Sequence, residues 1–149
     1  MDKVTIDGVI LTPLKQIFHP KGNVFHGMKK NDAGYSGFGE AYFSTIHGGD
    51  VKPWKKHLRM TLNFVIPVGE IRFVIYDDRK ESFTKGVFFD VTLGEANYQR
   101  LTIPAGVWVA FSGVGAGLNL LLNVANIEHD PTEIERKDNL NDIVYKWEK

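Results

Sequence analysis

A cluster of basic side chains near the middle of the chain is the clearest candidate for chemistry. It consists of Lys52, Lys55, Lys56, His57 and Arg59. Cations placed together can hold a phosphate or an enolate, because charge-assisted hydrogen bonds are the strong ones. Lys55 is a candidate base if burial lowers the pKa of its amine, and His57 is a second candidate catalyst. The alternative is a solvated strand edge, where charges prevent aggregation.

The spacing of the five histidines does not match a metal site. In a small β-barrel such a site typically uses two histidines separated by one residue, a nearby carboxylate and a third histidine on a later strand. Imidazoles and carboxylates then suit a borderline divalent ion. Here no two histidines are one residue apart, and residues 107–111 contain none. The sequence therefore predicts no metal. The histidines are His19, His26, His47, His57 and His129.

The motifs of several other enzyme classes are missing from the sequence. It contains no phosphate loop, no nucleophile elbow and no dinucleotide-binding glycine fingerprint after a strand. Residues 113–117 are rich in glycine, but they lie between two predicted strands and open no helix. We therefore predict a hairpin loop there, and no cofactor.

An alternation of apolar and other residues predicts the strands that must position these side chains. Ile71, Phe73 and Ile75 share one face of residues 70–76, and residues 62–66 alternate in the same way before a Pro-Val-Gly turn. Strands at such short, regular spacing are typical of a sandwich or barrel. Further strand candidates are residues 40–46, 87–93, 98–103, 107–111 and 118–126.

The sequence predicts one domain, residues 1–149, with a single apolar core. No repeat or linker divides it, and residues 130–141 are a charged segment that we expect to be extended or helical on the surface. That segment leads to Tyr145 and Trp147, which we expect to dock on the body. The predicted core includes Phe64, Ile66, Ile71, Phe73, Ile75, Phe89, Val91, Ile103, Phe111 and Leu121.

Composition excludes several function classes. The chain of 149 residues has no cysteine, which rules out disulfides, thiolate metal sites and cysteine nucleophiles, and it fits a reducing cytoplasm, the predicted location. Lys plus Arg equals Asp plus Glu at 18 each, so no general attraction to nucleic acid or to a membrane surface is expected. The longest apolar run, residues 118–125, is interrupted by Asn119 and Asn123 and is too short to span a bilayer.

A series of short motifs occurs in a recognisable order. They are Val-Ile-Leu-Thr-Pro at 9–13, His-Pro-Lys-Gly at 19–22, Val-Lys-Pro-Trp-Lys-Lys-His at 51–57, Asp-Asp-Arg at 77–79, Ile-Pro-Ala-Gly at 103–106 and Asp-Pro-Thr-Glu-Ile-Glu-Arg at 130–136. In their order and spacing they resemble the dTDP-4-dehydrorhamnose 3,5-epimerase family of the cupin superfamily, over nearly the whole chain. The resemblance implies an all-β fold, the cupin double-stranded β-helix or jelly roll, with a short C-terminal segment that is extended or helical.

The resemblance also implies an activity. Members of this family are dimers that need no metal and act on a nucleotide-linked 4-keto sugar. A histidine removes the proton next to the ketone, and a tyrosine returns a proton on the opposite face. The ketone acidifies the neighbouring C–H group, so a base of near-neutral pKa can remove its proton, and a nearby cation stabilises the enolate oxygen.

The chain departs from the family pattern at the base. Aligning residues 52–55 on the family's Arg-Gly-Leu-His stretch places Lys55 at the histidine and Lys52 at the arginine. A slipped alignment would bring His47 or His57 near the site instead. We favour the first alignment because the tryptophan and the following hairpin then keep their spacing.

The chain departs again at the proton donor. The family's tyrosine is expected at residues 127–129, where this chain has Ile-Glu-His. His129 is the candidate replacement, and the alternative is that it caps a loop beside Asp130. The predicted catalytic residues are therefore Lys55, His57 and His129.

The predicted substrate-binding residues are Lys52, Trp54, Arg59, Arg72 and Asn123. Trp54 can stack on a nucleobase or sugar, although core packing is the common fate of a tryptophan. Arg72 and Asn123 line the mouth of the barrel if their side chains face inward. Buried polar groups need hydrogen-bonding partners, and a ligand can supply them.

Two functions remain open from the sequence. The favoured one is an epimerase or isomerase of a nucleotide-linked 4-keto-6-deoxy sugar in surface-polysaccharide or deoxysugar biosynthesis. The alternative is a non-catalytic cupin that binds a sugar nucleotide or glycan in the inherited pocket. The resemblance also implies a homodimer, in which residues 4–11 are the natural element for exchange between copies.

Overall fold

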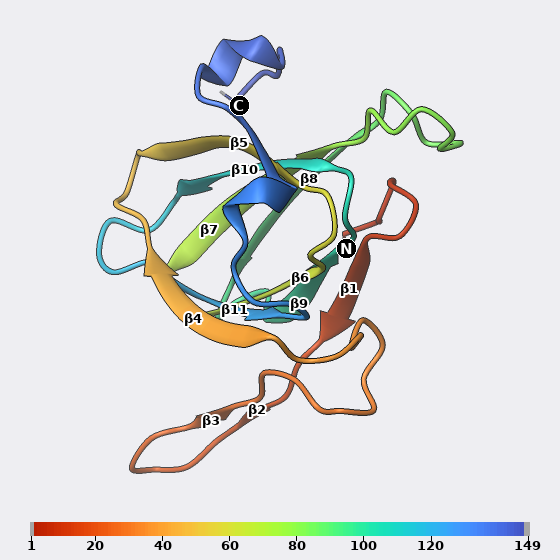
Figure 1. Cartoon of the computed structure of the whole chain (residues 1–149). Helices are drawn as coiled ribbons and strands as arrows, with labels where there is room; N and C mark the ends of the chain where they lie inside the picture. Colours follow the sequence, from red (N-terminus) through yellow and green to blue (C-terminus); the bar gives the residue numbers. More distant parts are fainter. Residues whose placement is uncertain (1, 148–149) are drawn as a thin grey trace.

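Two antiparallel sheets of five strands each face one another and form the body of the molecule (Figure 1). The computed structural model describes residues 2–147. The first sheet has the order β1 (Ile10–Pro13), β9 (Gln99–Ile103), β6 (Leu62–Val68), β11 (Leu120–Ala125) and β4 (Glu40–Thr45). The second has the order β12 (Ile134–Lys137), β5 (Val51–His57), β10 (Trp108–Gly113), β7 (Glu70–Tyr76) and β8 (Phe88–Gly94). The prediction of an all-β jelly roll is confirmed.

Two smaller parts lie outside this sandwich. A hairpin formed by β2 (Gln16–Ile17) and β3 (Val24–Phe25) projects from the body (Figure 1). The short 3₁₀ helices η1 (Pro131–Glu133) and η2 (Leu140–Asp142) flank β12. The segment at 130–141 is thus helical and extended in turn, and its extended part is an edge strand paired with β5. No helix among residues 2–147 is long and apolar enough to cross a membrane.

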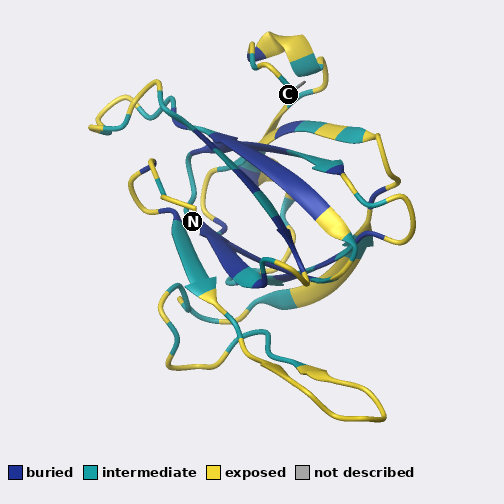
Figure 2. Cartoon of the chain, turned by 180° about the vertical axis from the view of Figure 1, so that it is seen from behind, coloured by how far each residue is buried: buried dark blue, intermediate teal, exposed yellow. Residues whose placement is uncertain are grey.

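The apolar core lies between the two sheets, where the strand alternation directs large side chains inward. Phe64 of β6 and Phe73 of β7 stack across the layers with ring centroids 5.2 Å apart. Figure 2 shows the buried residues concentrated on the strands of the sandwich. Nine predicted core residues are buried there, and Phe111 is half-buried against them. The nine are Phe64, Ile66, Ile71, Phe73, Ile75, Phe89, Val91, Ile103 and Leu121.

A second apolar layer covers the outer face of the second sheet. Trp54 and Trp108 pack there with Val74 and with Ile143 of the C-terminal segment. The Trp54 indole N–H donates to the carbonyl of Leu140, 2.9 Å away, which fixes η2 against the sheet. Strands β7 and β10 therefore bury both of their faces, whereas on β5 only Trp54 is buried. The face of the strand on which a polar residue lies decides whether it can reach a cavity between the sheets.

Candidate active site

Strand β5 presents different residues on its two faces. Successive side chains of a strand point to opposite faces, so Lys55 and His57 face the inside of the sandwich while Trp54 and Lys56 face outward. Between β5 and β10 the register shifts, because Val109 is opposite Lys55 whereas Phe111 is opposite Lys52. The extra residue in β5 is a β-bulge, and it brings Lys52 to the same side as Lys55.

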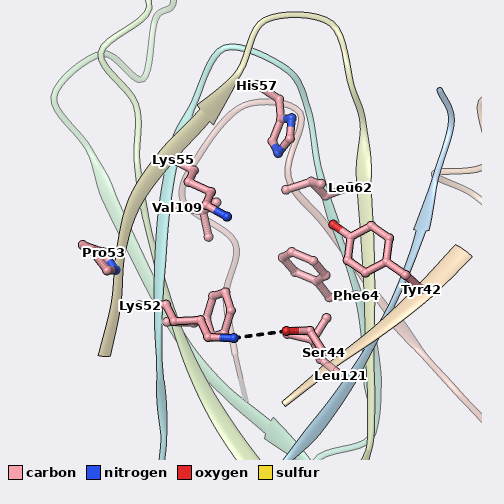
Figure 3. Close-up of a pocket in the computed structure, with 11 residues that line it drawn as sticks. Tyr42, Ser44, Lys52, Pro53, Lys55, His57, Leu62, Phe64, Val109 and Leu121 are labelled. Carbon is pink, nitrogen blue, oxygen red and sulfur yellow. Dashed lines mark hydrogen bonds between the residues drawn. The ribbon is translucent and has the colours of Figure 1, made fainter. Parts of the chain in front are cut away.

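The inward-facing residues of β5 form one wall of a cavity between the two sheets (Figure 3). Tyr42 and Ser44 of β4 form the opposite wall, and aromatic and aliphatic side chains of the core lie between the walls. The cavity combines a few polar groups with an apolar surface, which is typical of a small-molecule site. The lining residues are Tyr42, Ser44, Lys52, Pro53, Lys55, His57, Leu62, Phe64, Val109, Phe111 and Leu121.

His57 forms a hydrogen-bonded pair with Glu133. Its Nδ1 lies 2.6 Å from Oε1 of Glu133, and the two side chains are 10% and 1% exposed. Oε2 of the same carboxylate accepts the backbone N–H groups of Leu58, Arg59 and Met60 at 3.0, 3.0 and 3.2 Å. Both carboxylate oxygens are therefore occupied, and the imidazole is held in one orientation.

This arrangement sets the protonation state of the pair. Burial raises the pKa of Glu133, but the hydrogen bonds from His57 and from the Arg59 and Met60 N–H groups outweigh it and lower the pKa overall. The carboxylate is thus ionised at neutral pH and can only accept hydrogen bonds. Nδ1 of His57 then carries the proton of the shared bond, and in the neutral form of the ring Nε2 is the acceptor.

The sequence around Glu133 explains how it reaches the site. Asp130 caps η1 by accepting the Thr132 N–H, and Pro131 starts the helical turn with a suitable φ. The carbonyl of Glu133 also accepts the N–H of Leu58 at 2.7 Å. The turn therefore fastens the end of β5 to the start of β12 and aims the carboxylate at His57.

The lysines of β5 make the mouth of the cavity cationic. Lys52 Nζ donates to Ser44 Oγ at 3.2 Å and to the carbonyl of Thr45 at 2.7 Å, which links the two sheets across the cavity (Figure 3). Partial burial and the charges of Arg136 and Lys52 lower the pKa of Lys55, against a smaller opposite effect of Asp138. Arg136 is the residue of β12 paired with Lys55. An anionic ligand at this mouth would relieve the repulsion among the cations.

Of the predicted site residues, Lys52, Lys55 and His57 line the cavity. Trp54 lies in the outer apolar layer and Arg72 on the same outer face, so neither side chain lines this cavity, and their contact with substrate remains an untested prediction. Arg72 is bound there by the carboxylate of Asp90 and lies over the Trp147 ring. Successive side chains of a strand point to opposite faces of the sheet, and the side chains of Trp54 and Arg72 are on the face away from the cavity.

Three more predicted residues lie around the site without lining the cavity. Arg59 is exposed and pairs with Asp130 at 2.8 Å. His129 is exposed in a loop, where its backbone N–H donates to Glu40. Asn123 is fully buried and donates from Nδ2 to the hydroxyl of Tyr42 at 3.0 Å. Asn123 therefore reaches the cavity only through Tyr42.

Sequence reasoning missed Tyr42, Ser44 and Glu133. The first two belong to a strand that was recognised only as a strand, although both share its cavity-facing side. Glu133 belongs to the Asp-Pro-Thr-Glu motif, which supported the family resemblance, but no function was predicted for Glu133 itself. Its burial depends on the pairing of β12 with β5, which no local pattern reveals. Among residues 2–147, no group of three or more His, Cys, Asp or Glu side chains could hold a metal ion.

Comparison with known proteins identifies the family. A crystal structure of a dTDP sugar isomerase from Desulfovibrio desulfuricans is similar to this chain with a TM-score of 0.91 and 39% sequence identity. The match covers 96% of this chain and 92% of that one. The chain belongs to the dTDP-sugar epimerase and isomerase family of cupins. The family resemblance predicted from the sequence motifs is thereby confirmed.

More distant relatives of this cupin agree with the assignment. The 3'-monoepimerase ChmJ of Streptomyces bikiniensis, solved in complex with dTDP, shares the fold with a TM-score of 0.86 at 16% identity, over 99% of this chain and 78% of that one. A probable low-salt glycan biosynthesis epimerase of Haloferax volcanii is 38% identical over 84 residues, 56% of this chain and 54% of that protein. The match thus spans about half the length of that relative.

The spore coat polysaccharide biosynthesis protein SpsL of Bacillus subtilis is a second curated relative of this cupin. It is 26% identical over 132 residues, 89% of this chain and 87% of that protein. No family model matches the chain. Both curated relatives are named for glycan or polysaccharide biosynthesis.

Proposed function

We propose that this cupin is an epimerase of a dTDP-linked 4-keto-6-deoxy sugar that serves polysaccharide biosynthesis, with His57 as the catalytic base. The observation that supports the proposal most strongly is the hydrogen-bonded pair of His57 and Glu133, 2.6 Å apart at the wall of a cavity. A family of dTDP-sugar isomerases supplies the substrate class.

The proposed reaction begins when Nε2 of His57 takes the proton from the carbon next to the ketone. The electron pair of that C–H bond moves toward the ketone oxygen and forms an enolate. Glu133 stabilises the imidazolium that results, as a carboxylate does when it orients a catalytic histidine. The cations at the mouth, Lys55 and Lys52, stabilise the negative charge of the enolate or of the diphosphate.

His57 is a better candidate than Lys55 for the base, contrary to the alignment favoured from the sequence. A neutral imidazole has an acceptor nitrogen that takes a proton directly, whereas a lysine ammonium must first lose one. Glu133 also holds His57 in a single tautomer and orientation. We therefore assign Lys55 to charge stabilisation at the mouth.

The alternative, a non-catalytic cupin that binds a sugar nucleotide, uses the same cavity. Ligand binding alone does not require a histidine whose proton position is fixed by a buried carboxylate. The His57–Glu133 pair thus favours the enzyme. The two functions separate in an experiment that measures binding and proton exchange on the same protein.

The test follows the proton next to the ketone by NMR in heavy water, with dTDP-4-keto-6-deoxyglucose as substrate and an enzyme-free sample as blank. The wild-type protein should replace the proton at C3 or C5 with deuterium. His57→Asn should slow this exchange by about 10²- to 10⁴-fold, the usual contribution of a general base. Lys56→Ala is the matched control, because Lys56 faces outward beside Trp108.

Calorimetry with dTDP on the same samples completes the test. Binding without exchange would favour the non-catalytic cupin. Absence of both binding and exchange at millimolar ligand would exclude both functions.

The homodimer remains a prediction that sedimentation can test, with about twice the chain mass of 16.8 kDa expected. The exchange of residues 4–11 between copies also remains a prediction. Ile6 and Val9 of this segment pack into the core of their own chain, and Ile10 and Leu11 pair with β9.

A further inference from the structure

We propose that Tyr42 is the proton donor of the reaction and that Asn123 positions it, on the sheet facing His57. This inference rests on the proposed function and adds the second half of the reaction. Tyr42 belongs to β4 of the first sheet, and His57 belongs to β5 of the second. Both side chains line the same cavity (Figure 3).

The position of these two residues matches the stereochemistry of an epimerisation. Inversion requires that one group removes the proton from one face of the carbon and another returns a proton to the opposite face. A sugar ring held in the cavity would lie between the two sheets. His57 would then contact one face of the ring, and Tyr42 the other.

The hydrogen bonds of Asn123 determine whether the Tyr42 hydroxyl donates or accepts a hydrogen bond within the protein. Oδ1 of Asn123 accepts the backbone N–H of Asn63 at 3.0 Å, and a backbone N–H can only donate. The amide orientation is therefore fixed, and Nδ2 donates to the Tyr42 hydroxyl oxygen at 3.0 Å. The phenol oxygen accepts this bond, so its own hydrogen can point into the cavity.

The same bond suits the chemistry of proton donation. When the phenol gives up its proton, negative charge develops on its oxygen, and the Nδ2–H group of Asn123 stabilises that charge. Asn123 is fully buried, so the amide is already oriented before the reaction. Asn123 does not line the cavity, which makes it a positioning residue.

Other proton donors on this wall fit less well. Ser44 is the second hydroxyl of β4 in the cavity, but an aliphatic hydroxyl is a much weaker acid than a phenol. His129, the donor expected from the sequence, is exposed in a loop and does not line the cavity. Tyr42 also lies opposite Asn123 in the pairing of β4 with β11. Tyr42, on the strand paired with β11, would therefore take the role of the tyrosine that the family has after β11.

The proposed step balances as follows. The O–H bond of Tyr42 breaks, and its proton forms a new C–H bond on the face opposite to the one that His57 deprotonated. The enolate electrons form that bond while the C4 ketone is restored. The tyrosinate and the imidazolium then exchange protons with solvent, which returns both residues to their starting states.

The decisive experiment measures deuterium exchange and product formation separately on Tyr42→Phe. The substrate is dTDP-4-keto-6-deoxyglucose in heavy water, and the epimer is identified after borohydride reduction. His57 of the variant should still remove the proton and return deuterium to the same face, so exchange continues at a rate near that of the wild type. Formation of the epimer should fall by about 10²- to 10⁴-fold. Phe43→Leu is the control, because Phe43 is 66% exposed on the same strand.

Asn123→Asp tests the positioning role. The new carboxylate keeps an acceptor for the Asn63 N–H but offers Tyr42 a second acceptor in place of the donor. It should draw the phenol hydrogen away from the cavity and lower the ratio of epimer formed to deuterium exchanged. The ratio should recover as the pH falls and the carboxyl group regains a proton to donate. A purely structural defect would lower both rates together at every pH.

The outcomes distinguish the two proposals. If the wild type exchanges deuterium and Tyr42→Phe forms the epimer at the wild-type rate, the role of Tyr42 is wrong while the proposed function stands. If Tyr42→Phe loses exchange together with product while its circular dichroism stays native, Tyr42 is not a separate donor. If the wild type shows neither exchange nor product, the proposed function fails and the role of Tyr42 fails with it.

Discussion

Glu133 and Asp77 are two carboxylates that the fold buries in the same way and uses differently. Each is almost inaccessible to solvent and accepts several hydrogen bonds. Burial raises the pKa of Asp77, but bonds from Arg79, Ser82 and Thr84 outweigh it and hold the pKa far below its usual range. The pKa of Glu133 is lowered for the same type of reason.

The partners of the two carboxylates show why only one belongs to the site. The side-chain partners of Asp77 follow it within seven residues and bind a loop together, with Arg79 Nε at 2.9 Å and Ser82 Oγ at 2.6 Å. Glu133 instead binds His57, whose ring lines the cavity and carries a second nitrogen. A low carboxylate pKa thus indicates hydrogen bonds that outweigh the effect of burial, and the cavity-facing atom of the partner identifies a catalytic pair.

The largest expected effect comes from the loss of charge at Glu133. Glu133→Gln should slow deuterium exchange by about 10²- to 10⁴-fold, because a neutral amide no longer fixes the tautomer of His57 or stabilises its imidazolium. The rate is measured by NMR on the sugar C–H signals. Asp77→Asn is the matched carboxylate-to-amide change, and the folded variant should exchange at the wild-type rate. Equal losses in both variants would contradict the distinction.

The free energy of unfolding should show the opposite order, with a larger loss in Asp77→Asn than in Glu133→Gln. Asp77→Asn should lower the free energy of unfolding by on the order of 3 kcal/mol, because Arg79 loses its buried charged partner. Glu133→Gln should cost about 1–2 kcal/mol, since its amide oxygen can still accept backbone N–H groups. Urea unfolding followed by circular dichroism measures both. A larger loss at Glu133 than at Asp77 would mean that the site carboxylate is also the main structural one.

Local patterns were sufficient to predict most strands and the core, and the family resemblance supplied the jelly roll. Residues 62–66 and 70–76 alternate around a Pro-Val-Gly turn, and they form β6 of the first sheet and β7 of the second. Period-two alternation also identifies which residues are inside, and so the core was predicted almost completely. Strands β2, β3 and β12 were not among the predicted strands, and β5 was considered only as a strand edge. The sequence of β12 is short and charged, and the strand is stabilised by pairing with β5.

The site was predicted only in part because it depends on contacts between distant segments. Lys52, Lys55 and His57 share one strand and were found together. The bulge that aligns Lys52 with Lys55 arises from the register with β10, which leaves no sequence signal. The pair between His57 and Glu133 joins residues 76 positions apart.

The next expected effect concerns the two neighbouring lysines of β5. Lys55 lines the cavity, whereas Lys56 faces outward over the ring of Trp108 at 4.9 Å. Lys55→Ala should weaken dTDP binding by about ten- to a hundred-fold, as expected for one charge-assisted hydrogen bond to phosphate. Lys56→Ala should leave the affinity unchanged in calorimetry. Added salt should weaken wild-type binding more than binding by Lys55→Ala, because the cation at the mouth is accessible to ions.

The smallest expected effect is in the pH dependence of stability, and it again compares Asp77 with Glu133. A carboxyl group whose pKa is lower in the folded than in the unfolded protein binds fewer protons when folded at mildly acidic pH. Its contribution to stability is fully present above the unfolded pKa, ordinarily 3.8 for Asp77 and 4.5 for Glu133, and is lost as the pH falls through the folded pKa. Each group therefore adds at most about 1.4 kcal/mol per pH unit to the slope of stability against pH.

Urea unfolding between about pH 4 and pH 2 can separate these two contributions. Asp77→Asn should flatten the acid slope more than Glu133→Gln, because the pKa of Asp77 is lowered further and its contribution persists to lower pH. Lys56→Ala is a control on the outer surface and should retain the wild-type slope. If Glu133→Gln flattened the slope more, the pKa of the site carboxylate would be the lower of the two. The Asp77 network would then be the weaker of the two buried carboxylate networks.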